Sequence, residues 1–338
     1  MPAVTRPPPL TRREVLAGGR REAPADGHWV RVHRRAMACR FEVILSDDDA
    51  RHVEAARAAL DEADGVEALL TVFRDTSEVA AVNRQAADRP VVVGDLLFAL
   101  LERCRVLHAA TGGAFDPTSG PLTRCWGFLA REGRLPGADE IAEARAAVGF
   151  DKVRLDAEAR TVRFLAPGMS LNFGGIGKGL ALDRMAAILR ARGVPRALVS
   201  AGGSSAIAIG GGGFMVDLRS PRVEGVLGRL RLAEAALGTS GAGEQYFEVD
   251  GRRYGHVIDP RTGWPCAGVL SASVIAPEAA LADAVSTAFL VAGADLAEPY
   301  CAANPGTRAI LTMEADPGRR VEFGARGGVR LEPDGDRA

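Results

Sequence analysis

Hydrophobic and polar positions change their period along the chain, so helices and strands are expected in turn. Arg40 to Ser46 alternates as a half-buried strand does, whereas Asp49 to Leu70 repeats apolar positions at helical spacing. Gly94 to Ala110 predicts a second long helix, which Thr111 to Gly113 ends because glycine readily takes the backbone conformation that follows a helix. Lys178 to Arg192 predicts a third helix, opened by a glycine-rich turn.

The second half of the chain is expected to be rich in strands. The predicted strands share short apolar runs bounded by turn residues or charges. They are Ala197 to Ser200, Ser205 to Ile209, Phe214 to Leu218, Val226 to Leu232, Gln245 to Val249, Leu270 to Ile275 and Ala309 to Met313. The glycines from Gly210 to Gly213 predict the turn of a hairpin, and Asp151 to Asn172 predicts a meander of three strands. With a further helix expected over Pro277 to Ala292, the predicted fold class is α+β, and residues 28–332 are expected to form one compact, bilobed unit.

The two ends of the chain differ from this unit in composition. Residues 1–27 are rich in Pro and Arg and predict a disordered leader, and residues 333–338 predict a frayed tail. Thr11 to Ala17 is similar to a twin-arginine export signal, but the apolar segment that such a signal needs does not follow. No run of eighteen apolar residues exists, so no transmembrane segment is expected. A cytoplasmic location is therefore favoured, with the periplasm as the alternative.

Composition and charge narrow the class of protein. The chain has 338 residues, of which 47% are hydrophobic and 25% charged, as in an ordinary globular protein large enough for an enclosed active site. The net charge of −1 offers no excess of positive charge to hold nucleic acid, so nucleic acid is not an expected partner. The five cysteines show neither paired metal spacing nor a Cys-x-x-Cys motif and are expected to be mostly buried thiols. They are Cys39, Cys104, Cys125, Cys266 and Cys301.

The segment from Tyr254 to Gly263 carries the densest set of polar groups. It delivers His256 to a sharp Asp-Pro turn, and twenty residues later Asp283 and Thr287 follow at the spacing of one helical turn. A carboxylate and a hydroxyl on one helix face are oxygen donors that suit a hard cation. Asp283 would be costly to bury among alanine and valine without a partner, and either a cation or Arg261 could be that partner. A lone histidine also commonly has a purely structural role.

The glycine-rich turn from Asn172 to Gly179 follows a predicted strand and opens a predicted helix. Its amides and the helix dipole could face a phosphate. The turn is neither a Walker loop nor a G-x-G-x-x-G dinucleotide motif, and tight packing of a strand against a helix explains the glycines equally well. Lys178 favours the phosphate interpretation, because it is one of only two lysines among 42 basic residues and stands just inside the helix start.

A second loop, from Thr111 to Leu122, presents Phe115 and Asp116 together. An aromatic ring and a carboxylate on such a loop suit a planar heterocycle with a polar edge. A loop shaped by Pro and Gly and held by aromatic side chains is the alternative. Glu78 and Asn83 are ambiguous in the same way, since a capped short helix explains them adequately.

Taken in order, these motifs resemble a known family. The order is A-M-x-x-R-F-E-V, S-E-x-x-x-x-N, T-G-G-A-F-D-P-T-x-G-P-L with W-G-F, F-G-G-I-x-K-G-x-A-x-D, T-S-G, Y-x-H-x-I-D-P-R-T-G and A-D-A-x-S-T-A. It is similar to that of the ApbE flavin transferases, which are FAD:protein FMN transferases, over roughly residues 30 to 295. Single motifs are weakly specific, but seven in one order are highly specific. The resemblance implies the mixed helix and strand, T-fold-like architecture of that family.

The resemblance also implies roles for individual residues. Flavin contacts are implied for Met37, Phe73, Ala114, Phe115 and Asp116. Other residues implied to line or close the FAD site are Asn172, Lys178 and Ile258. The implied magnesium ligands are Asp283, Thr287 and the backbone carbonyl of Gly175. The implied catalytic residues are His256, Asp283 and Lys178, with His256 orienting or deprotonating the attacking hydroxyl.

The activity implied by the resemblance is Mg²⁺-dependent transfer of FMN from FAD to a threonine hydroxyl of an acceptor protein, which forms a phosphoester and releases AMP. The alternatives are a relative that binds or hydrolyses FAD without modifying a protein, and a non-enzymatic flavin-binding scaffold. The chain lacks an Asp-x-x-[Ser/Thr]-[Gly/Ser]-Ala-Thr acceptor sequence, so self-modification is not expected.

Four positions depart from the family pattern. Asn172 stands where aspartate is usual, which removes a negative charge beside the flavin. Ala38 and Cys39 replace a common Gly-Thr, and Ser204 stands where an acidic residue often follows two glycines. The lipoprotein cysteine of the family is also absent near the N-terminus, so the usual outward-facing anchor is not expected.

Overall fold

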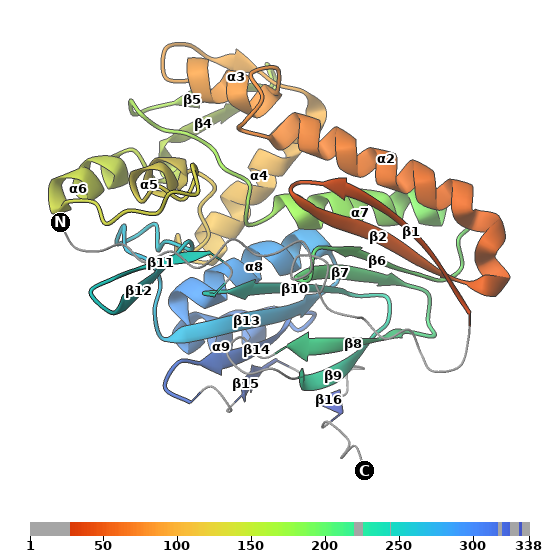
Figure 1. Ribbon diagram of the computed structural model, residues 1–338. Helices are drawn as coiled ribbons and strands as arrows, with labels where there is room; N and C mark the ends of the chain where they lie inside the picture. Colours follow the sequence, from red (N-terminus) through yellow and green to blue (C-terminus); the bar gives the residue numbers. More distant parts are fainter. Residues whose placement is uncertain (1–27, 220–225, 244, 317–319, 325–330, 333–338) are drawn as a thin grey trace.

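An eight-stranded antiparallel sheet forms the centre of the protein (Figure 1). The computed structural model describes residues 28–219, 226–243, 245–316, 320–324 and 331–332, so the expected leader and tail lie outside the described residues. The strands run in the order β1-β2-β6-β7-β10-β13-β14-β15. Their bounds are β1 Trp29–Ala36, β2 Cys39–Ser46, β6 Ala197–Ala201, β7 Ser205–Ile209, β10 Ala236–Gly241, β13 Val269–Ala276, β14 Arg308–Met313 and β15 Arg320–Phe323.

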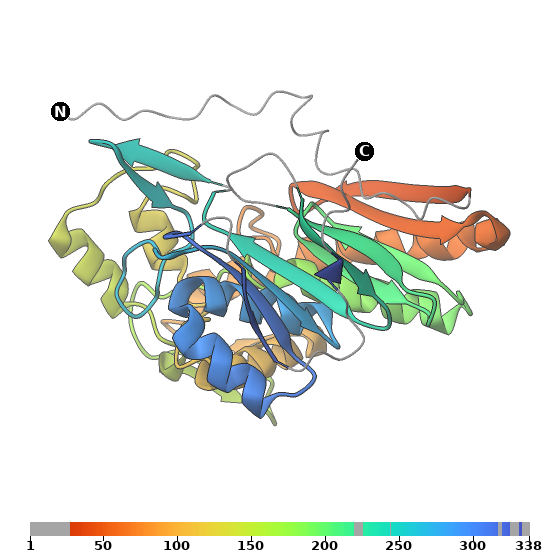
Figure 2. The same ribbon diagram turned by 90° about the horizontal axis from the view of Figure 1, so that it is seen from below.

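Both faces of this sheet are covered. Four helices pack on one face (Figure 2): α2 Val53–Leu70, α7 Gly177–Ala191, α8 Ala279–Ala292 and α9 Ala294–Ala303. A three-stranded sheet shares a separate hydrophobic cluster with the other face. Its order is β16 Leu331–Glu332, β9 Val226–Leu232 and β8 Phe214–Arg219. Because both faces are covered, β7 and β13 are buried along their whole length instead of alternating.

The remaining elements lie around one end of the main sheet (Figure 1). The helices are α3 Glu78–Gln85, α4 Asp95–Ala110, α5 Gly120–Cys125 and α6 Ala138–Ala146, with a short 3₁₀ turn at Phe150–Lys152. Another 3₁₀ turn, Asp47–His52, connects β2 to α2 elsewhere in the molecule. The strands are β3 Val91–Val92, β4 Val153–Asp156, β5 Thr161–Phe164, β11 Tyr246–Val249 and β12 Arg252–Gly255. Mixed helices and antiparallel sheets confirm the α+β prediction. No described helix combines the length and apolarity that crossing a bilayer requires.

Two local predictions were wrong. Gly210 to Gly213 do not turn a hairpin, because β7 pairs with β6 and β10 while β8 pairs with β9, so these glycines connect two different sheets. Gly210 has φ +93° and a Cβ there would lie 2.5 Å from the carbonyl oxygen of Pro195, which explains the glycine without a hairpin. The segment expected to form a three-strand meander contains only β4 and β5. The third strand of that sheet is β3, which precedes α4 in the chain.

Helix α8 lies unusually close to its neighbours. A Cβ on Gly179 of α7 would overlap the carbonyl oxygen of Ala279, and a Cβ on Gly238 of β10 would lie 2.5 Å from the carbonyl carbon of Ala282. The Asp183 carboxylate on α7 accepts hydrogen bonds from the amides of Ala279 (2.7 Å) and Ala280 (2.9 Å) at the start of α8. Burial raises the pKa of Asp183 to about 6, against the lowering effect of these two amides.

We expect Gly179→Ala to lower the free energy of unfolding by about 3 kcal/mol or more, because the added methyl group can only be accommodated by moving α8. Gly65→Ala in α2 is the matched control, since no atom lies within 4 Å of a Cβ there. That change should raise stability by up to about 1 kcal/mol through helix propensity. Urea unfolding of both variants measures the difference, and equal stabilities would contradict the close approach.

Candidate active site

A cavity of about 290 Å³ opens where α7 begins and β10, α8 and two loops meet it. Most of the residues predicted for the site line it. They are Ala114, Phe115, Asp116, Asn172, Gly175, Lys178, His256, Ile258 and Thr287. The structure therefore brings together side chains from segments that lie up to 173 positions apart, Ala114 to Thr287, in the sequence.

The glycine-rich turn and α8 meet at one end of the cavity. A Cβ on Gly175 would lie 3.2 Å from Thr287 Oγ1 and 3.6 Å from Phe115 Cε2, so this glycine keeps the wall open. Thr287 Oγ1 donates to the carbonyl oxygen of Asp283 (3.1 Å) and lies 3.1 Å from Ser240 Oγ on β10. The cavity end is therefore rich in hydroxyl and carbonyl oxygens.

The Asp283 carboxylate lies behind this wall and is 6% exposed. Its Oδ2 accepts a hydrogen bond from the Gly179 amide at 2.7 Å, and its Oδ1 accepts one from Ser205 Oγ at 2.7 Å. These two donors offset part of the cost of burying the charge and fix the orientation of the carboxylate. No local pattern pointed to Ser205, because it stands at the start of an otherwise apolar strand.

Lys178 is connected to Asp283 through two serines. Its Nζ donates to Ser204 Oγ at 2.5 Å, and Ser204 Oγ lies 3.4 Å from Ser205 Oγ. An acidic residue at position 204 would place a negative charge beside Lys178, whereas Ser204 is neutral. This contact therefore does not offset the positive charge of the Lys178 ammonium at the cavity wall.

The donor set suits a hard cation. No group of three His, Cys, Asp or Glu side chains capable of binding a metal occurs within the described ranges, so a thiolate or imidazole site is not indicated there. The Asp283 carboxylate supplies oxygens of the kind that a hard cation takes, held in place by the Gly179 amide and the Ser205 hydroxyl. Together with the Thr287 hydroxyl and the backbone of Gly175, it has the oxygen chemistry that Mg²⁺ takes.

His256 lies on the loop after β12 and lines the cavity. Its Nδ1 is 3.2 Å from the carbonyl oxygen of Gln245, which can only accept, so Nδ1 carries the proton in the neutral ring and Nε2 is the basic nitrogen. The loop is anchored by Trp126, whose Nε1 donates to the carbonyl oxygen of Gly263 at 2.9 Å. The fully buried Trp126 therefore explains the W-G-F motif as support for the histidine loop.

Asn172 stabilises the glycine-rich turn itself. Its side-chain Oδ1 accepts a hydrogen bond from the Gly174 backbone amide at 2.9 Å, and its backbone amide donates to the carbonyl oxygen of Pro117 at 2.7 Å. An aspartate could make the same bond to Gly174, so the asparagine preserves the turn and removes only the charge.

Met37, Phe73 and Asp283 do not line the cavity. Met37 (φ +48°) and Ala38 (φ +58°) form the two-residue turn between β1 and β2, where left-handed conformations are strained for residues other than glycine. Phe73 lies between α2 and α3 with 75% of its surface exposed. Their implied flavin contacts stay predictions.

Glu78 and Asn83 have structural partners. Asn83 donates to the carbonyl oxygen of Leu171 (3.0 Å) and accepts from the Leu171 amide (2.7 Å), while Glu78 accepts from the Gly94 amide. Ser77 caps α3 by accepting from the Ala80 amide at 3.0 Å, which confirms the predicted capped helix.

A model of the ApbE family matches residues 37–311 of this sequence. The chain belongs to the ApbE family. It is 34% identical over 278 residues to the FAD:protein FMN transferase of Treponema pallidum, covering 77% of this chain and 76% of that protein. The structure is similar to the ApbE protein of Thermotoga maritima, with a TM-score of 0.81, 29% identity and coverage of 88% and 97% of the two chains. For the apo flavinyl transferase ApbE of Pseudomonas stutzeri the TM-score is 0.77, with 26% identity and coverage of 89% and 95%.

We expect Ser205→Ala to lower the free energy of unfolding by about 1–3 kcal/mol, because the buried Asp283 carboxylate loses a donor. Ser170→Ala is the matched control: Ser170 is also buried, but its Oγ has no hydrogen-bond partner among the residues that the structure describes. That variant should be unchanged or slightly more stable. Thermal unfolding of the two proteins is the measurement, and a Ser205→Ala loss no larger than that of Ser170→Ala would refute the role of the hydroxyl.

Proposed function

We propose that this ApbE-family protein transfers FMN from FAD to a threonine hydroxyl of an acceptor protein, in a reaction that depends on Mg²⁺ and releases AMP. The observation that supports this most directly is that a single cavity is lined by His256, Lys178 and Thr287, with Asp283 directly behind Thr287. Together these residues supply a base, a fixed cation and oxygen ligands at one place. The names of the relatives support flavin transfer in general.

The anionic part of FAD has complementary groups at the start of α7. Lys178 is the second residue of this helix, whose N-terminal end carries partial positive charge. Gly174 and Gly175 line the same wall without side chains, so a diphosphate could approach the backbone closely. The cavity of about 290 Å³ is at the lower end for a ligand pocket, so part of the dinucleotide would extend beyond it.

Mg²⁺ would be held by Asp283, Thr287 and the carbonyl oxygen of Gly175. When bound, such an ion neutralises charge on phosphate oxygens and lowers the barrier to displacement at phosphorus. The protein's own contribution is orientation: the Gly179 amide and Ser205 hold the Asp283 carboxylate in place before any ligand arrives.

His256 is suited to accept the proton of the attacking hydroxyl. The threonine oxygen would form a bond to the phosphorus on the FMN side, and the bond between that phosphorus and the oxygen bridging to AMP would break. The threonine proton would pass to Nε2, the basic nitrogen set by the contact of Nδ1 with Gln245. Lys178 would stabilise the negative charge that develops on the phosphate oxygens.

We expect the protein, incubated with FAD, MgCl₂ and a peptide carrying Asp-x-x-Ser-Gly-Ala-Thr, to add the mass of an FMN phosphoester to that peptide. Asp283→Asn should reduce the rate at least about 100-fold, since it weakens the proposed metal site while keeping an oxygen for the Gly179 amide. Mass spectrometry of the peptide and chromatography of AMP are the measurements.

A peptide with valine in place of threonine is the control and should stay unmodified. AMP release without a modified peptide would replace the proposal with FAD hydrolysis. FAD binding without either product would indicate a binding protein, and absence of FAD binding would leave a scaffold.

We expect Asn172→Asp to weaken FAD binding in the absence of Mg²⁺ and to strengthen Mg²⁺ binding in the presence of FAD. The expected change is roughly fivefold in each, the effect of one added charge worth about 1 kcal/mol. Asn304→Asp, which adds the same charge outside the cavity lining, is the control. Calorimetric titration measures both affinities, and identical values for the native protein and Asn172→Asp would exclude Asn172 from the site.

A further inference from the structure

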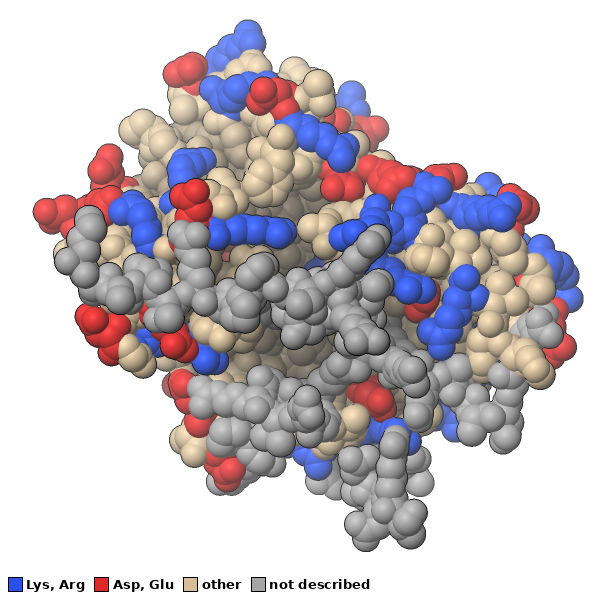
Figure 3. Space-filling model, viewed as in Figure 1, with Lys and Arg blue, Asp and Glu red and all other residues tan. Residues whose placement is uncertain are grey.

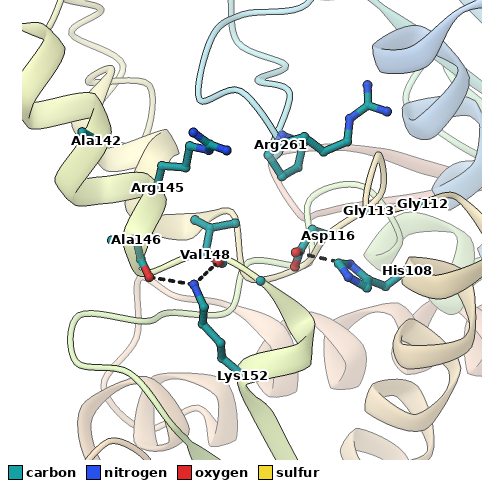
Figure 4. A pocket seen from close by; sticks show the side chains of 12 residues that line it. His108, Gly112, Gly113, Asp116, Ala142, Arg145, Ala146, Val148, Lys152 and Arg261 are labelled. Atoms are coloured by element: carbon teal, nitrogen blue, oxygen red, sulfur yellow. Dashed lines mark hydrogen bonds and ion pairs between the residues drawn. The ribbon is translucent and has the colours of Figure 1, made fainter.

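A second hollow, of about 570 Å³, shares Asp116 and Pro260 with the cavity (Figure 4). Asp116 therefore forms part of the wall between the two spaces. Figure 4 shows the His108 ring, at the end of α4, directed toward the Asp116 carboxylate at the floor of the hollow. His108 itself does not line the cavity, so any influence on a ligand there would act through Asp116 and its loop.

The Asp116 carboxylate is almost completely enclosed, with 2% of its side chain exposed. Oδ1 accepts from the amide of Thr118 (2.8 Å) and from its hydroxyl (2.6 Å), and Oδ2 accepts from the Phe150 amide at 3.2 Å. His108 Nδ1 lies 3.3 Å from Oδ2. This contact becomes a charge pair when His108 is protonated, and Nδ1 meets the geometry of a hydrogen bond with no group in the described part of the chain.

The charge of His108 is the variable one in this pair. Its interaction with Asp116 raises the pKa of His108 above the ordinary value of a histidine, supported by the backbone of Phe115 and by Asp151, while burial opposes the shift. The other charges around the hollow are Arg145, Lys152 and Arg261. Lys152 donates to two backbone carbonyls and Arg261 pairs with Asp259. Among the described residues Asp116 forms an ion pair with His108 and with none of these three cations.

We propose that His108 is a positioning residue for flavin binding, which holds the loop of Phe115 and Asp116 and neutralises the carboxylate at the cavity wall. This rests on the proposed function, because the ligand is the anionic dinucleotide FAD. Protonated His108 cancels the charge of Asp116 beside the cavity and keeps the loop in place. When the proton leaves, no positive charge balances the negative charge of Asp116 in the cavity wall, so the affinity for anionic FAD falls.

FAD affinity is expected to fall as pH rises. The protonated form of His108 binds FAD more tightly, so affinity is highest below the ordinary pKa of histidine and decreases as pH rises through the raised pKa of His108. If FAD binding and protonation of His108 are coupled by one pKa unit, the affinities of the protonated and unprotonated forms for FAD differ tenfold. We therefore expect a roughly five- to tenfold loss of FAD affinity as pH rises from below the ordinary pKa of histidine to above the raised pKa of His108.

The experiment is a titration of the native protein with FAD, without added metal, over this pH range, followed by flavin fluorescence. His108→Gln should bind FAD weakly at every pH, near the high-pH value of the native protein. Asp116→Asn should be insensitive to pH and bind near the low-pH value, since it removes the charge that His108 compensates while keeping an oxygen for Thr118. His52→Gln, a half-exposed histidine that lines neither space, should follow the native curve.

Two further readouts separate positioning from a merely structural role. Turnover at saturating FAD should be unchanged in His108→Gln while KM for FAD rises, because the residue does not touch the reacting atoms. His256 also lines the cavity, so only the part of the pH dependence that disappears in His108→Gln is assigned to His108.

A native affinity that does not change with pH overturns the inference, as does a pH dependence that survives in both His108→Gln and Asp116→Asn. If either variant fails to fold, the other still decides between these outcomes. FAD binding with the expected pH dependence but without transfer to a peptide supports the inference and removes the transferase proposal. Absence of FAD binding by the native protein at every pH removes both.

Discussion

The contact between the Gly179 amide and the Asp283 carboxylate is the constraint on which the candidate site depends. It joins the first turn of α7 to α8, the helix that carries Thr287. The bond is possible only because Gly179 and Gly238 have no side chains, so that α8 lies against both α7 and β10. Asp183 of α7 also stabilises this junction, because its carboxylate accepts hydrogen bonds from the first backbone amides of α8. The cavity is thus a consequence of how closely two helices pack.

This junction also determines how a buried carboxylate is tolerated. An isolated charge in such a position would cost several kcal/mol, but hydrogen bonds from the Gly179 amide and from Ser205, which in turn contacts Ser204, offset much of that cost. The same bonds limit the motion of the carboxylate, which favours a ligand whose geometry matches it. Surface charges are arranged differently: Figure 3 shows basic and acidic side chains interspersed over α2 and β1, where Arg34 lies 2.5 Å from both Asp61 and Asp64. Such exposed pairs add little to stability.

Sequence patterns predicted the elements whose burial follows a simple period. The ranges of α4, α7 and β13 were correct within one or two residues, because one or two fully buried faces leave a clear apolar pattern. Strand β10 was missed, since the close approach of α8 requires glycine and small polar residues where an apolar run would be expected. The turn at Gly210 was misread because a glycine run does not reveal whether the next strand pairs with the previous one.

The candidate site shows the same division between local and long-range information. The spacing of Asp283 and Thr287 placed both on one helix, but only the folded chain shows that the carboxylate lies behind the cavity wall and the hydroxyl in it. Ser205 and His108 had no local signal at all, since each acts through a residue far away in the sequence. Spacing can predict which side chains lie on the same helix or strand. The side chains that support them from other elements, such as Ser205 and His108, are set by tertiary packing.

The charge balance of the cavity follows from two neutral side chains. Asn172 and Ser204 stand where the family resemblance favours acidic residues, and each keeps the hydrogen bond that its position requires. Lys178 therefore faces a serine, and its positive charge is not cancelled locally. Among the residues that line the cavity, Asp116 carries the only carboxylate, and its charge is opposed by His108 from behind. Two neutral side chains in place of acidic ones favour an anionic ligand over a free cation, so in the proposed reaction Mg²⁺ would bind together with the FAD diphosphate, which supplies the missing negative charge.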